Sequence, residues 1–144
     1  MKYAKPSGFT TIELLVTLFV ATAFIAAFAQ IFSVIDRGTT EAKWQSAASN
    51  LAYSNLRKYS SASDVTGFAC NSTTNLTTNA SAAGQVIQTN NYTGSAVQLP
   101  GSTVTVEVRA FAPAGCGTTP IKLVATTTFG GAPIRKVIHA TYVY

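Results

Sequence analysis

The sequence is poor in the side chains from which catalytic sites and metal centres are built. Among 144 residues there are five acidic residues, ten basic residues, two cysteines and one histidine. Catalytic and metal sites need several such side chains close together. The chain has no paired carboxylates, nucleophile motif or metal-ligand cluster, and His139, on the opposite strand face from Ile138, is predicted to lie at the surface or at a sheet edge. The sequence therefore indicates neither an enzyme nor a cofactor-binding protein.

Helix-breaking residues are missing from much of the chain. No proline occurs between Pro6 and Pro100, and Gly38 is the only glycine between Phe9 and Thr66. A proline costs about 3 kcal/mol inside a helix, whereas a lone glycine weakens a helix without ending it. The sequence therefore predicts one helix over residues 9–61, roughly 80 Å long at 1.5 Å per residue.

The first half of this helix, residues 9–35, lacks charge almost entirely. From Leu14 to Ile35 there are 22 residues and no charged side chain. A helix of that length measures about 33 Å, which matches a hydrocarbon core of about 30 Å. The segment is therefore a transmembrane candidate. Glu13 stands at its start, and because a carboxylate in a membrane segment is costly, it calls for a partner.

The second half of the helix, residues 36–61, is amphipathic. Apolar residues recur at three- and four-residue steps, namely Trp44, Ala47, Ala48, Leu51, Ala52, Leu56 and Tyr59. Lys43, Gln45, Asn50, Asn55 and Lys58 are predicted to cover the other face. An apolar stripe of this kind must pack against another element. We therefore assign this half to a globular head that spans residues 36–144.

The rest of the head reads as a loop followed by strands. Residues 62–102 are rich in Asn, Thr and Ser and are predicted to form a loop, with one short strand over 85–88 as a further hypothesis. Period-two alternation and β-branched residues predict strands over residues 103–111, 121–129 and 134–144. The fold class is therefore α+β, with an antiparallel sheet covering the amphipathic half of the helix.

Cys70 and Cys116 are the two cysteines of the chain. An even count outside a membrane suggests a disulfide, which would close a loop of about 47 residues and stabilise the fold by roughly 4 kcal/mol. Two buried free thiols are the alternative.

The junction between the leader, residues 1–8, and the helix is specific. The run Gly8-Phe9-Thr10-Thr11-Ile12-Glu13-Leu14 resembles the class III leader site of type IV pilins and pseudopilins. The resemblance implies that prepilin peptidase cleaves between Gly8 and Phe9 and methylates the Phe9 amine. It also implies that Glu13 faces the N-terminal amine of a neighbouring subunit in a fibre.

The same resemblance implies a location and partners. The precursor would be inserted in the cytoplasmic membrane, and the mature subunit would then be extracellular or periplasmic in a pilus-like fibre. Its partners would be other pilin subunits and the inner-membrane assembly platform. Many bacterial pilins have a glycine and a proline where this chain has Thr22 and Gln30, so we expect a more continuous helix here.

Several alternatives remain open at this stage. A pseudopilin of a type II secretion or competence system, or a minor tip pilin with an adhesive role, carries the same leader motif. Ala27-Phe28-Ala29 is a signal-peptidase pattern, and a plain single-pass anchor would also explain the apolar run. A DNA-binding role is a further hypothesis, with a basic patch made of Arg109, Lys122, Arg135 and Lys136 beside Tyr142 and Tyr144.

Overall fold

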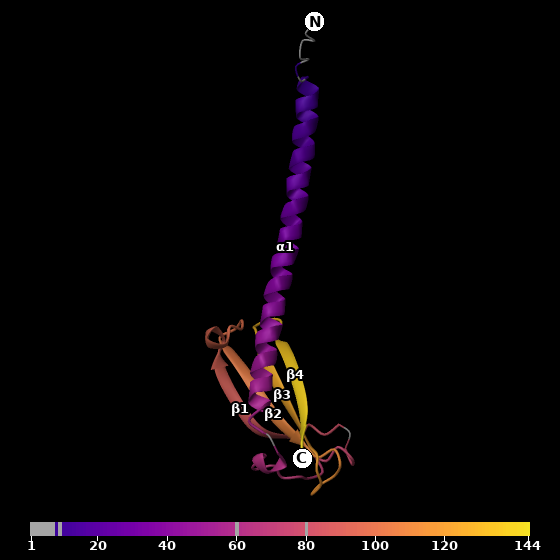
Figure 1. The fold of residues 1–144 in the computed structure, drawn as a ribbon, viewed down its shortest axis with the longest axis vertical. Coiled ribbons are helices and arrows are strands. Elements are labelled where there is room, and N and C mark those ends of the chain that lie inside the picture. The colour runs from indigo at the N-terminus through magenta and orange to yellow at the C-terminus, as the bar shows by residue number, and fades with distance from the viewer. Residues whose placement is uncertain (1–7, 9, 60, 80) are drawn as a thin grey trace, which may run out of the picture. The chain divides into compact units, whose positions relative to one another are not determined.

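The computed structural model describes residue 8 and residues 10–59, 61–79 and 81–144 (Figure 1). It divides into two compact units, residues 1–41 and residues 42–144. Residues 1–7 of the expected leader and Phe9 lie outside the described residues.

Helix α1 runs without interruption over Thr11–Leu56. It begins where the Thr10 hydroxyl accepts the Glu13 backbone N–H (3.3 Å), which satisfies one of the free donors of the first turn. The helix ends about five residues earlier than the sequence predicts. Its last turn closes when the Tyr59 N–H donates to the Leu56 carbonyl (3.0 Å).

The early end of α1 has a local cause. Ser61 and Asp64 form a capping box at the short 3-10 helix η1, Ala62–Asp64, in which the Ser61 N–H donates to the Asp64 carboxylate (2.8 Å). Serine and aspartate bond readily to nearby backbone groups and therefore favour caps over helix interiors. A second helical start so close to Leu56 is incompatible with continuation of α1.

The head contains one four-stranded antiparallel sheet in the order β1-β2-β3-β4. The strands are β1 (Gln85–Thr93), β2 (Thr103–Phe111), β3 (Ile121–Phe129) and β4 (Arg135–Val143). Strands β2, β3 and β4 confirm the three predicted segments within one residue at each end. Figure 1 shows the C-terminal turns of α1 lying across one face of this sheet.

Strand β1 is the main difference from the sequence-based description, in which residues 62–102 are a loop with a short strand over 85–88. The strand continues to Thr93 and is followed by the 3-10 helix η2, Gly94–Val97. It includes Asn90 and Asn91, which have low strand propensity. Pairing with β2, where Asn90 lies opposite Val106, holds them in the sheet.

The core lies between the C-terminal half of α1 and the sheet. Alternate residues of β2 and β3 are fully buried on one face, as in Val104, Val106 and Val108. Ala48 and Ala52 of α1 are fully buried, and their small side chains allow the helix to approach the strands closely. All seven residues of the predicted apolar face belong to the two core clusters: Trp44, Ala47, Ala48, Leu51, Ala52, Leu56 and Tyr59.

Asn55 is an exception, because the sequence predicts it on the polar face and the structure buries it to 1% exposure. Its amide donates to the Leu51 carbonyl (2.8 Å), and its Oδ1 accepts bonds from Asn90 (2.8 Å) and Lys58 (3.0 Å). A buried amide is tolerated only when its polar atoms are bonded. These partners explain why a polar residue occupies a core position.

The loop after η1 is tied to the sheet. The predicted disulfide between Cys70 and Cys116 is formed, with a Cα–Cα distance of 5.3 Å. Close by, the Ala112 N–H donates to the Thr74 carbonyl (3.0 Å). Where the loop enters β1, Gly84 has φ +71°, and a Cβ there would lie 2.5 Å from the Phe111 ring. Only glycine fits this turn without displacing Phe111.

Candidate assembly segment

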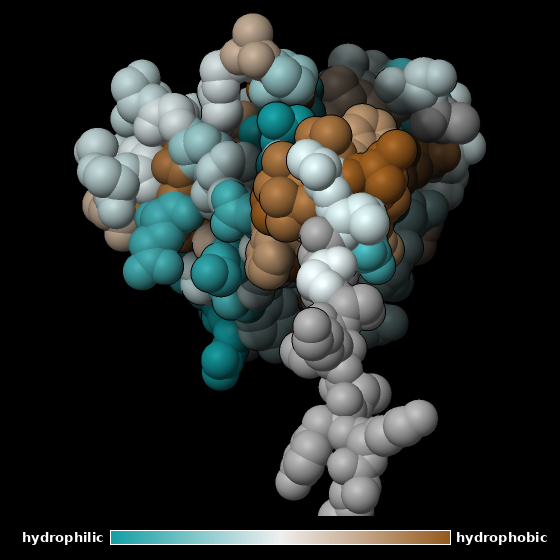
Figure 2. Space-filling model, turned by 90° about the horizontal axis from the view of Figure 1, so that it is seen from above, coloured by the Kyte–Doolittle hydropathy of each residue, from teal (hydrophilic) through white to brown (hydrophobic). Residues whose placement is uncertain are grey.

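The N-terminal half of α1 is an apolar surface that the chain itself leaves uncovered. Every residue from Thr11 to Thr39 is exposed, including Phe19 at 75% and Phe32 at 69%. In Figure 2, hydrophobic side chains, drawn in brown, gather near the middle of the view among white and teal ones. By length and composition, α1 is long and apolar enough to cross a membrane. A folded chain does not leave so much apolar surface bare in water.

Glu13 lies in the first turn of α1 and is exposed. Its backbone N–H is bonded to the Thr10 hydroxyl, which is half of a capping box of the Thr-x-x-Glu type. No hydrogen bond or ion pair of its carboxylate is found within the described part of the chain. The sequence pattern from Thr10 to Glu13 is itself a signal for this cap. The carboxylate itself is left available to another molecule.

Gly8, the residue before the expected cleavage site, is exposed, and a Cβ built on it would meet nothing within 4 Å. The fold therefore places no steric demand for glycine at this position. Phe9, on the other side of the expected cut, lies outside the described residues. Any requirement for glycine at position 8 would therefore come from another molecule.

Other polar side chains of the apolar half differ in whether their polar atoms are hydrogen-bonded within the helix. The Thr17 hydroxyl donates to the backbone carbonyls of Glu13 and Leu14 (2.9 Å each), and the Thr22 hydroxyl donates to that of Phe19 (2.8 Å). For Gln30, no bond of the side-chain amide is found among the described residues. The helix runs through Thr22 and Gln30 without a break, as predicted.

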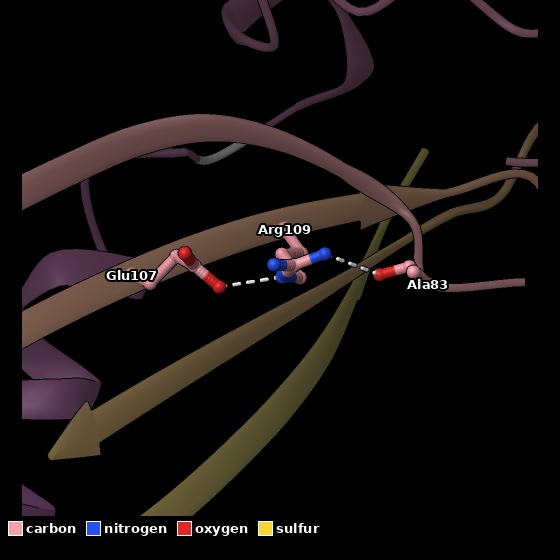
Figure 3. Close-up of polar contacts among 3 residues, drawn as sticks. All are labelled: Ala83, Glu107 and Arg109. Carbon is pink, nitrogen blue, oxygen red and sulfur yellow. Dashed lines mark hydrogen bonds and ion pairs between the residues drawn. The ribbon is translucent and has the colours of Figure 1, made fainter.

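The four basic residues predicted to form a patch do not all come together: by strand register, Arg109 and Lys122 are diagonal neighbours on one face of the sheet, whereas Arg135 and Lys136 lie apart from them. The Arg109 guanidinium is paired with Glu107 and donates to the Ala83 carbonyl at 2.9 Å (Figure 3). Arg135 lies on the other face of the sheet, with its guanidinium 5.1 Å from the centre of the Trp44 ring.

The two lysines of that set share a face but are far apart. Lys122 pairs with Tyr142 and Lys136 pairs with Thr128. Six residues along β4 separate the two pairings, which is about 20 Å at 3.3 Å per residue. The four cations therefore form no single continuous patch, and Tyr142 lies opposite Lys122.

A small cavity lies between the end of α1 and the edge strand β4. Its volume is about 260 Å³, and it is lined by Tyr53, Leu56, Arg57, Tyr59, His139, Ala140 and Thr141. His139 is on an edge strand and on the face opposite Ile138, as predicted. However, it is half-buried, and its Nε2 lies 2.7 Å from the Ser49 hydroxyl. The histidine therefore joins β4 to α1 rather than standing free at the surface.

Tyr59 lines the same cavity, and its hydroxyl donates to Gln88 Oε1 (3.1 Å). Burial raises the pKa of the Tyr59 phenol above its ordinary value, because desolvation disfavours the phenolate. The neutral phenol is therefore the form that the head accommodates.

Comparison of the chain with family models, with curated proteins and with solved structures finds no match. Within residues 8, 10–59, 61–79 and 81–144, no three His, Cys, Asp or Glu side chains are grouped as metal ligands.

Proposed function

We propose that this chain is a structural subunit of a type IV pilus, processed after Gly8 and assembled through the N-terminal half of α1. The observation that carries the proposal is the difference in exposure between the two halves of one continuous helix. Its residues from Thr11 to Thr39 are all exposed and mostly apolar, whereas Ala48, Ala52 and Leu56 are buried against the sheet. The first half needs a partner outside the chain, and the second half already has one within it.

Other copies of the same helix, or a lipid bilayer, are the partners that this surface suits. Apolar helices associate by close packing and by bonds between polar groups. The exposed carboxylate of Glu13 supplies such a group at the helix start. If cleavage exposes the Phe9 amine, that amine would have a pKa of about 8 and be largely cationic at neutral pH. An amine and a carboxylate buried together cost less than either one alone.

Mass spectrometry of the mature protein tests this proposal most directly. We expect an N-terminus at Phe9, an added methyl group on its amine and a mass that fits one disulfide. A protein cut after Ala29, or one that retains Met1, would contradict the proposal, because each would remove or alter the charged end that assembly requires.

A pseudopilin is the second candidate, and the uninterrupted helix through Thr22 and Gln30 favours keeping it. Both candidates undergo the same processing, so the mass of the mature protein does not distinguish them. They differ in where the fibre is found. Immunogold labelling of intact cells distinguishes them. Labelled surface fibres support the pilus subunit, whereas label that appears only after the outer membrane is opened supports the pseudopilin.

A further inference from the structure

Gln30 is an uncommon residue for its place in α1. It lies inside the uncharged run, five residues before Ile35, which is about 7.5 Å from the end of that run along the helix. A bilayer offers no water to bond its amide, and an unbonded amide in an apolar medium is costly. Lysine and arginine can reach the interface from such depths, but the glutamine side chain is shorter.

Two other polar residues of the uncharged run, Thr17 and Thr22, are hydrogen-bonded within the helix, whereas for Ser33 no bond of the hydroxyl is found among the described residues. Thr17 and Thr22 donate to carbonyls of the preceding turn, so each hydroxyl is hydrogen-bonded whether the helix lies in water or in a bilayer. The amide of Gln30 has no such bond in the described part of the chain. It offers two N–H donors and one carbonyl acceptor, and only another molecule at the same depth can engage them.

The helix side around Gln30 allows another helix to approach closely. At about 100° per residue, Ala23, Ala26 and Ala27 lie about 20°, 40° and 60° from Gln30 around the axis, and bulkier residues flank this small-residue stretch at Phe19 and Val34, about 20° and 40° from Gln30. The opposite side carries bulky residues, namely Phe24, Ile25, Phe28, Phe32 and Ile35. Small residues beside a polar group are what associating membrane helices commonly have at their contact.

We infer that two copies of the chain pair in the membrane as parallel helices whose Gln30 amides hydrogen-bond to each other. The inference rests on the proposed function, since it requires the apolar half of α1 to lie in a bilayer. Copies inserted with the same orientation bring Gln30 to the same depth. A two-fold axis between them then lets each amide donate to the carbonyl oxygen of the other.

This contact is separate from the one proposed for Glu13. Seventeen residues separate Glu13 from Gln30, which places them about 100° apart around the helix. Arg37 lies two turns beyond Gln30 on the Gln30 side, past the end of the uncharged run, where water can screen the two like charges. The pair therefore needs neither cleavage at Gly8 nor the Phe9 amine, and it describes the subunit before assembly.

Cysteine cross-linking of the full-length chain in membranes tests the inference. Ala23→Cys places a thiol on the Gln30 side, and Ala21→Cys places one on the opposite side at nearly the same depth. The native cysteines are already bonded to each other. Under mild oxidation, we expect a cross-linked dimer for Ala23→Cys and little for Ala21→Cys.

A second substitution, at Gln30, tests whether the dimer depends on the Gln30 amide. In the Ala23→Cys chain, Gln30→Leu should weaken association about 3- to 30-fold, the range for hydrogen bonds between membrane helices, and Gln30→Asn should retain most of the dimer. Equal cross-linking at both cysteine positions, no dimer at Ala23→Cys, or no response to Gln30→Leu would overturn the inference.

The failures of the two proposals can be told apart. Normal fibres together with no Gln30-dependent dimer would contradict this inference alone. A Gln30-dependent dimer in a strain that never forms fibres would support the inference and contradict the proposed function. Release of the chain from membranes by alkaline carbonate would contradict both, because neither survives without a membrane segment.

Discussion

The Asn90 side-chain amide donates to Oδ1 of Asn55 over 2.8 Å, in the core between β1 and α1. The Tyr92 hydroxyl lies 3.5 Å from the same oxygen. Apolar packing alone permits a helix to slide along a sheet, whereas a buried hydrogen bond forms at one position only. Asn55 therefore sets the position of α1 on β1.

Replacing Asn55 with alanine should lower the free energy of unfolding by about 1–3 kcal/mol, because it removes a buried amide and leaves the half-buried Asn90 amide without this bond. Asn50→Ala, at an exposed position of the same helix, should change stability by no more than about 0.5 kcal/mol. Urea unfolding in detergent, followed by fluorescence of the single tryptophan, Trp44, measures both variants. Equal effects of the two substitutions would contradict the role given to Asn55.

Loss of the Cys70–Cys116 disulfide should lower the free energy of unfolding by about 2–4 kcal/mol, because the bond limits the freedom of the unfolded chain. The double variant Cys70→Ser with Cys116→Ser and the reduced wild-type chain should lose similar stability. The reducing agent should leave the double variant unchanged, which makes that variant the control. A loss below about 0.5 kcal/mol would mean that packing alone holds the loop.

The pKa of Tyr59 makes stability fall in alkaline solution. In the unfolded chain a tyrosine phenol loses its proton near pH 10, whereas burial raises the pKa of this phenol in the folded chain. Above about pH 10 the unfolded chain binds fewer protons and is favoured. The Tyr59 contribution is therefore fully present below about pH 10 and is lost as pH rises through the folded pKa.

Urea midpoints measured between pH 8 and pH 11 test this dependence. The decline of the urea midpoint with rising pH should be shallower in Tyr59→Phe than in the wild-type chain. Tyr53→Phe, at a tyrosine that is 56% exposed, is the matched control. An unaltered decline in Tyr59→Phe would assign the pH dependence to other groups.

The cap at the start of α1 allows the two roles of its first turn to be separated. Glu13→Ala leaves the capping bond intact, because that bond uses the Glu13 backbone N–H and the Thr10 hydroxyl. Thr10→Ala removes the cap, at a cost of about 0.5–2 kcal/mol, but keeps the carboxylate. We expect Glu13→Ala to be processed normally yet to abolish most fibres, and Thr10→Ala to retain them. Abundant fibres from Glu13→Ala would refute the proposed contact with the N-terminal amine.

Local features of this chain could be predicted from its sequence because they depend on residues near one another. The missing prolines and charges indicate α1, the three- and four-residue steps indicate its buried face, and the alternating valines indicate β2. The end of α1 at Leu56 was predicted less well, since the apolar steps continue to Tyr59 while the Ser61–Asp64 cap competes with them. His139 was placed on the correct face, but its contact with Ser49 depends on a helix 90 residues away.

The sequence by itself determined a helix with an uncovered apolar half, a carboxylate at its start and three strands for its other half to pack on. Those properties follow from period, charge and chain length. Only the tertiary structure decided that residues 85–93 form a strand, that Asn55 is buried and that Arg109 and Arg135 lie on opposite faces of the sheet. The physical reason is that pairing with β2, a bond to Asn90 and the register of neighbouring strands join residues far apart in the chain, so no local pattern encodes them.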